Sequence, residues 1–327
     1  MTTAGSGNLG ATVPAVSDIL PVPPAGPTPG GPRQGGAAAA RFARGGLVTG
    51  VILAVLVLFL LVVAFFPGLV ASGDPTASTG VPLTGPSGSH WFGTDDLGRD
   101  VLTRVVWGGH PILLESVLGI LISTVAGVSL GLLGGMTRGL VSGIVMRALD
   151  VMLALPALLI AMMVVAIVGT GVSSIVIAVG ASYIPAFARV VYGSVQRLRT
   201  ADYIAAARLF GAGRTRTVIR HMVPNLATEI AVLASSAVGW AVLTAATLSF
   251  LGFGVSLPSP DWGVDLASGS QYLGTAWWVS TFPGLAITAT ILLSNYLGDY
   301  VGSILDPRRT ARVRRPGLKH RPTDTTG

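Results

Sequence analysis

The stretch Leu47–Phe66 reads LVTGVILAVLVLFLLVVAFF and contains 20 residues without a charged side chain. A helix needs about 20 predominantly apolar residues to cross the hydrocarbon core of a bilayer. Arg41 and Arg44 precede this stretch, and arginine next to a span favours the cytoplasmic side. The sequence therefore predicts a transmembrane helix at 47–66, with the N-terminus of the chain in the cytoplasm.

More apolar stretches of spanning length follow, at residues 113–135, 144–168, 172–194, 226–250 and 279–300. Only 11% of the 327 residues are charged, against about 25% in ordinary soluble domains, which excludes a soluble enzyme. Six spans return the chain to its starting side, so the C-terminus is also expected in the cytoplasm. The predicted fold class is an all-α polytopic membrane protein with six transmembrane helices.

The distribution of charge agrees with this topology. The outer loops 67–112 and 251–278 carry Arg99 and Arg104 as their only arginines, against six acidic residues. Arginine in cytoplasmic segments orients membrane proteins, which explains the net charge of +7 without a nucleic acid partner. The chain has no cysteine, so disulfides, thiolate catalysis and cysteine-ligated metals are excluded.

Three regions follow from this organisation. Residues 1–44 are rich in Gly, Pro and Ala and are predicted to form a disordered cytoplasmic tail. Residues 45–309 form the transmembrane domain, and 310–327 form a basic cytoplasmic tail. Within the domain, the inner segment 200–225 is unusually long, because connections have a median of about 4–6 residues.

The inner segment 200–225 begins with a predicted short helix over 202–211. Thr200 can cap its start, Asp202 lies in its first turn, and Gly211 suits its end. Its alanines, at 205–207, would let the backbone of another protein approach closely. Composition alone fits an ordinary surface loop equally well.

This segment resembles the EAA coupling loop of ABC-importer permeases. Ala206, Ala207, Gly211 and Pro224 stand at the matching positions, whereas Ala205 replaces the glutamate of that family and Val223 replaces its usual leucine. The resemblance implies that this loop docks an ATPase subunit. The residues it implies for this contact are Asp202, Tyr203, Ala205, Ala206, Ala207, Arg208, Gly211, Gly213 and Pro224.

Other segments resemble the C-type permease subunits of dipeptide, oligopeptide and nickel importers, over roughly residues 45–309. They are HWFGTDDLGRDVLTR at 90–104, DVMLALP at 150–156, SFLGFG at 249–254, PSPDWG at 258–263, Pro283-Gly284, and NYLGD at 295–299 with Asp306-Pro307-Arg308. The resemblance implies a type I ABC-importer permease of the bacterial inner membrane. It also implies a second, homologous permease, two ATPase subunits that carry ATP and Mg, and an extracellular binding protein.

The cargo implied by this resemblance is a dipeptide or oligopeptide, with nickel or another small solute as the alternative. The chain contains no phosphate-binding loop of the Gly-x-x-x-x-Gly-Lys-Ser/Thr type. ATP hydrolysis is therefore assigned to partner subunits; the chain itself is not expected to be an enzyme or to bind a cofactor. Its four histidines lie on different segments, so no metal site is predicted.

Two rival classes fit less well. A secondary transporter would need inverted repeats and broken midplane helices, which the sequence does not show. An intramembrane hydrolase would need His221 beside Ser235 or Ser236, but the histidine lies about four helical turns away.

The outer segment at 90–104 is predicted to be a self-stabilised cap, with direct contact to substrate as the alternative. Asp95 and Asp96 precede Arg99, and Asp100 precedes Arg104, at spacings that allow ion pairs on a helix. The cap residues are Asp95, Asp96, Gly98, Arg99, Asp100 and Arg104.

Charges inside predicted spans are functional candidates by default. Glu115, near the outer end of the second span, is the candidate for lining a polar pathway. Asp150 follows Arg147 by three residues, which predicts a local ion pair. The tryptophans near the outer boundary are predicted to form an interfacial belt: Trp91, Trp107, Trp262, Trp277 and Trp278.

Overall fold

The computed structural model describes residues 35–202, 204, 209 and 213–305. The chain divides into two compact units, Met1–Leu47 and Val48–Gly327. In the described part the regular secondary structure is helical, and no strand is present. The helices are α1 (Gly35–Phe65), α2 (Pro67–Val70), α3 (Val101–Met136), α4 (Leu140–Leu153), α5 (Ala157–Val168), α6 (Val172–Arg199), α8 (Arg214–Thr217), the π-helical turn η2 (Val218–Met222), α9 (Val223–Phe250), α10 (Trp262–Ser270) and α11 (Trp278–Leu305).

By length and composition, α3, α6 and α9 can each cross a membrane. Helices α4 and α5 would add a fourth span if the bent pair is treated as one segment. Thr49–Phe65 is an apolar helix that is shorter than these spans. The predicted spans 113–135, 172–194, 226–250 and 279–300 are helical throughout, and 47–66 is helical as far as Phe65. The number of spans stays a prediction.

The predicted span 144–168 is not one continuous helix. Helix α4 ends at Leu153, α5 begins at Ala157, and the two are bent by 97°. Pro156 is the N-cap residue of α5. Proline disfavours helical geometry in the residue before it, which explains the break. By contrast, Pro185 lies inside α6 without ending it.

Helix α3 packs against α6 along a column of small residues spaced four apart. Gly119, Gly127, Gly131 and Gly135 all face α6: a Cβ atom added to any of them would lie 2.5–2.6 Å from an α6 atom. Ser123 continues the column, and its hydroxyl donates a hydrogen bond to the Gly180 carbonyl at 2.7 Å. Small residues at such interfaces let helix backbones approach closely.

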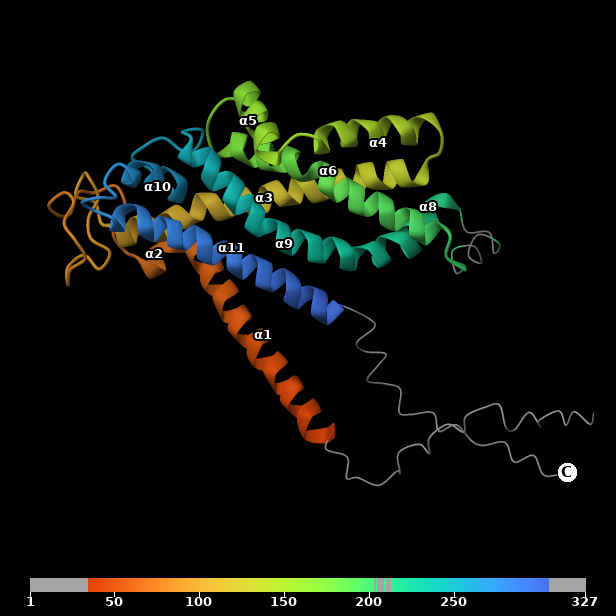
Figure 1. Cartoon of the computed structure of the whole chain (residues 1–327), viewed down its shortest axis with the longest axis horizontal. Helices are drawn as coiled ribbons and strands as arrows, with labels where there is room; N and C mark the ends of the chain where they lie inside the picture. Colours follow the sequence, from red (N-terminus) through yellow and green to blue (C-terminus); the bar gives the residue numbers. More distant parts are fainter. Residues whose placement is uncertain (1–34, 203, 205–208, 210–212, 306–327) are drawn as a thin grey trace, which may run out of the picture. The chain divides into compact units, whose positions relative to one another are not determined.

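The largest buried apolar cluster joins α5, α6 and α9. It includes Val165 of α5, Ile175 and Phe187 of α6, and Leu248 of α9, all of which are almost fully buried. Figure 1 shows the loop before α3 and helix α10 at one end of the helices of the second unit, with α8 at the opposite end. The two candidate sites therefore lie at opposite ends of this unit.

Candidate functional site

The first candidate site is a buried ion-pair cluster around Arg104, in the first turn of α3. Its Nε donates to Asp265 of α10 at 3.1 Å, and its Nη2 also contacts this carboxylate. Its Nη1 donates to the carbonyls of Pro75 and Pro258, at 3.1 and 3.0 Å. Arg104 and Asp265 are only 2% and 5% exposed. One guanidinium thus ties α3 to α10 and to the loops on either side.

Asp95 organises the turn that precedes α3. Its carboxylate accepts from the backbone N–H of Leu97 and of Arg99, both at 2.9 Å, and from Arg99 Nε at 2.6 Å. Asp96 lies 3.8 Å from Arg99. The Asp95–Arg99 pair is present as predicted, but in a turn rather than on a helix. Gly98 has φ +73°, a conformation that glycine adopts readily.

The predicted Asp100–Arg104 pair is wrong. Asp100 is the N-cap residue of α3, and its carboxylate accepts from the backbone N–H and the hydroxyl of Thr103, both at 2.8 Å. The same carboxylate lies 3.0 Å from Nδ1 of His90. Capping the helix start turns this side chain away from Arg104, which pairs instead with Asp265 and lies 3.7 Å from Asp95.

Asp261 and Asp265 place two buried carboxylates on α10, outside the membrane-spanning segments. Asp261 caps this helix by accepting from the backbone N–H groups of Gly263 and Val264, at 2.8 and 3.1 Å. Burial raises the pKa of Asp261. Burial also raises the pKa of Asp265, to about 6, although the charge of Arg104 opposes the shift. Nothing in the sequence near Arg104 indicates Asp265 as its partner.

The tryptophans of the predicted belt differ widely in their exposure. Trp91 and Trp277 are 71% and 51% exposed. Trp262 and Trp278, in contrast, are 2% and 8% exposed, and their indole N–H groups donate to the carbonyls of Val105 and Thr94. These two rings are packed within the chain, which local sequence does not show. Their position relative to the membrane stays a prediction.

Among the charged residues of the predicted spans, Asp150 has another partner than expected. Asp150 of α4 pairs with Arg189 of α6, so the predicted pair with Arg147 is wrong. Glu115 of α3 is fully buried in this chain, and neither of its carboxylate oxygens has a hydrogen-bond partner in the described part. No group of three or more His, Cys, Asp or Glu residues among the described ones could hold a metal ion.

The second candidate site is the inner segment between α6 and α9. Tyr203, Ala205, Ala206, Ala207, Arg208 and Gly211 lie outside the described residues. Of the others, Asp202 and Gly213 are exposed, and Pro224 lies in the first turn of α9. Leu209 is 88% exposed, whereas Ile204 is fully buried. Thr200 is the C-cap residue of α6 and donates its hydroxyl to the Arg197 carbonyl.

Polar contacts join the two helices that flank this segment. Glu229 of α9 accepts from Arg197 Nη2 at 3.0 Å and from the hydroxyl of Ser194, both of α6. The inner segment is therefore flanked in the chain by two helices that are held together. Leu209 is a single exposed apolar side chain, which by itself does not mark a contact surface.

Comparison with known proteins adds three findings. Residues 127–311 match the family model of the binding-protein-dependent transport system inner membrane component. The dipeptide transport system permease protein DppC of Escherichia coli (strain K12) is 43% identical over 270 residues, which cover 80% of this chain and 89% of that protein. The glutathione transport system permease protein GsiD of Pectobacterium atrosepticum is 38% identical, covering 68% of this chain and 74% of that protein.

The fold has a solved counterpart in an inward-facing conformation of the MetNI methionine ABC transporter. The TM-score is 0.50 at 20% identity, and the match covers 62% of this chain and 96% of that chain. At this identity the likeness concerns the fold alone.

Proposed function

Because this chain belongs to the family of binding-protein-dependent transport system inner membrane components, we propose that it is a permease subunit of an ATP-driven peptide importer. It is a multi-pass protein of the bacterial inner membrane. The observation that carries the proposal is the 43% identity to a dipeptide permease over 80% of the chain. Nickel or another small solute remains the alternative cargo, and a glutathione permease is among the relatives.

The proposed topology has six spans and both termini in the cytoplasm. The spans are α1, α3, the bent pair α4 and α5, α6, α9 and α11. The ion-pair cluster around Arg104 then faces outward, and the segment 200–225 faces the cytoplasm. The cluster would act as a rigid outer cap, since its buried charges form ion pairs with one another, Asp95 with Arg99 and Arg104 with Asp265.

The proposed partners are a second permease, two ATPase subunits, an extracellular binding protein and membrane lipid. The permeases would enclose the pathway between them, with Glu115 as the candidate residue near it. ATP and Mg would be bound by the ATPase subunits, and this chain would bind no cofactor. Coupling requires that the nucleotide states of the ATPase hold the 202–211 helix in different arrangements.

Topology can be tested directly, because the chain contains no cysteine. Ser89→Cys in the outer loop and Arg216→Cys in α8 each place one thiol at an exposed position. In spheroplasts, a membrane-impermeant maleimide should label S89C at once and R216C only after permeabilisation. Labelling of R216C in intact spheroplasts would refute the proposed orientation.

Coupling can be tested by changing the exposed apolar residue of the inner segment. Leu209→Asp should abolish co-purification of the ATPase subunits and ATP-dependent uptake of a labelled dipeptide into vesicles. The matched control is Val81→Asp, because Val81 is 74% exposed in the outer loop and should retain both. Uptake by the isolated chain, or unchanged ATPase binding in L209D, would contradict the proposal.

A further inference from the structure

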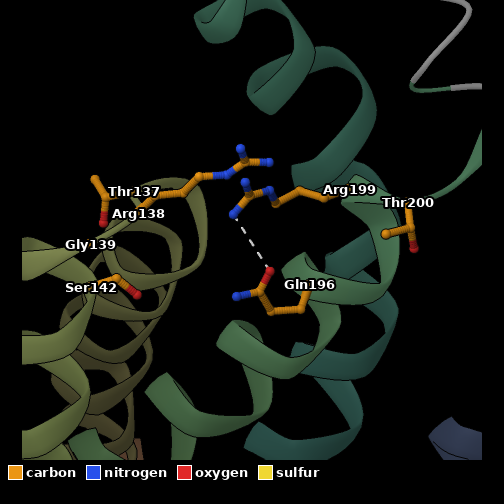
Figure 2. A pocket seen from close by; sticks show the side chains of 7 residues that line it. All are labelled: Thr137, Arg138, Gly139, Ser142, Gln196, Arg199 and Thr200. Carbon is orange, nitrogen blue, oxygen red and sulfur yellow. Dashed lines mark hydrogen bonds between the residues drawn. The ribbon is translucent and has the colours of Figure 1, made fainter.

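A pocket of about 340 Å³ lies between the end of α3, the start of α4 and the end of α6. Its lining, drawn in Figure 2, consists of Thr137, Arg138, Gly139, Ser142, Gln196, Arg199 and Thr200. Both α3 and α6 are candidate membrane spans. The pocket therefore lies at the depth where two spans end, which is where lipid headgroups meet water.

The pocket carries two arginines and no acidic residue. Both arginines line the same pocket, and Figure 2 shows their side chains reaching toward the space between α3 and α6. Arg199 is anchored, because its Nη1 donates to the Gly135 carbonyl at 2.6 Å and approaches Gln196 Oε1 at 3.5 Å. Among the residues that the structure describes, neither arginine has a carboxylate partner, and Arg138 makes no hydrogen bond. Two neighbouring cations without a counter-charge favour the binding of an anion.

The start of α4 adds to the positive potential of this pocket. Gly139 is its N-cap residue, no side chain caps the helix, and its first turn contains no acidic residue. The first backbone N–H groups of a helix lack partners inside that helix and carry a partial positive charge. Gly139 and Ser142, at this helix start, both line the pocket.

We propose that this pocket binds a phosphate group through Arg138 and Arg199. The planar guanidinium matches phosphate oxygens in a bidentate manner. The phosphate can come from the headgroup of an anionic phospholipid or from free phosphate in solution. The lipid source is favoured by Leu140 and Ile144 of α4, which are 79% and 60% exposed close to the pocket and offer an apolar surface for an acyl chain.

The test uses the full-length chain, purified with its associated subunits, in nanodiscs that contain both phosphatidylcholine and phosphatidylglycerol. Native mass spectrometry counts the lipids retained by the wild type, by Arg138→Gln and by the double variant R138Q/R199Q. The matched control is Arg147→Gln, which removes an exposed arginine of α4 outside the pocket. R138Q guards against misfolding, since within the described part of the chain this side chain has no hydrogen bond or ion pair to lose.

The wild type and R147Q should retain phosphatidylglycerol above its share of the mixture. This enrichment should fall roughly fivefold for each pocket arginine removed. A second arm, in nanodiscs of phosphatidylcholine alone, compares the melting temperature in inorganic phosphate and in chloride of equal ionic strength. If phosphate raises the melting temperature of the wild type and of R147Q but not of the pocket variants, and if no protein enriches phosphatidylglycerol, the site binds free phosphate.

Two results would overturn the proposal. In one, R147Q lowers the enrichment as much as R138Q does, which would show a general charge effect. In the other, the wild type responds neither to phosphatidylglycerol nor to phosphate.

Discussion

Arg104 and Asp265 lie 161 positions apart in the sequence, yet they form a buried ion pair that joins α3 to α10. Helix α10 lies between α9 and α11 in the chain, so this contact links the start of α3 to the connection between those two helices. Asp100 caps the start of α3, and Asp95 organises the turn before it. These residues form one connected cluster, and each of them can be tested by substitution.

Arg104→Gln should destabilise the chain near neutral pH. Removing one partner of a buried pair leaves an uncompensated charge, which costs about 3–5 kcal/mol. Thermal unfolding of the detergent-purified protein measures this loss. Asp74→Asn, at an exposed aspartate whose partner is Thr76 of the same loop, should have little effect. Equal stability of R104Q and the wild type would contradict a structural role for the cluster.

Stability should depend on pH through Asp265. Its pKa in the folded chain, about 6, lies above its ordinary value of 3.8, so the folded chain holds the proton more tightly than the unfolded chain. The stability contributed by this group is present below pH 3.8 and is lost as pH rises through about 6. Asp265→Asn removes this titration. Denaturation of both proteins from pH 4 to 7 should show the variant gaining relative to the wild type as pH rises; a constant difference would contradict this prediction.

Gly131→Ala should destabilise the chain, because the added Cβ would lie 2.6 Å from the Ala188 carbonyl of α6. Overpacking of this kind costs about 1–3 kcal/mol. Gly143→Ala on α4 is the matched control, since its Cβ would meet nothing within 4 Å and alanine favours a helix. The melting temperature should fall for G131A and hold or rise for G143A. A fall of equal size in both would contradict close packing of α3 on α6.

A double-mutant cycle can test the pairing of Asp150. Asp150→Asn and Arg189→Gln should each destabilise, and the double variant should lose less than the sum, with a coupling of about 0.5–3 kcal/mol. The same cycle with Arg147→Gln should give no coupling, because Arg147 makes no ion pair within the described part of the chain. Coupling to Arg147 instead would support the pair expected from sequence spacing.

The positions of the long helices were predictable where a continuous apolar run marks them. Stretches such as 172–194 and 226–250 recur within α6 and α9, because apolar length is what a bilayer selects. The break before Pro156 lies inside such an apolar run, and hydropathy carries no information about backbone geometry. For the same reason, the 97° bend between α4 and α5 was not predicted.

The ion-pair cluster around Arg104 shows the corresponding limit for side chains. The Asp95–Arg99 pair was predictable because the two residues are near neighbours in sequence. Sequence spacing predicted an ion pair between Asp100 and Arg104, but the Asp100 carboxylate caps the start of α3 instead. Asp265 and Trp262 could not be placed by any local rule, because only the fold brings α10 against α3.

The glycine column of α3 has a mechanical consequence. With Gly119 and Gly135 seated directly on valine side chains of α6, no slack remains for one helix to slide along the other without steric overlap. Close packing of this kind favours movement of the two helices together. A change of shape of this protein would then fall on the connections next to them, which are residues 137–139 after α3 and residues 169–171 before α6.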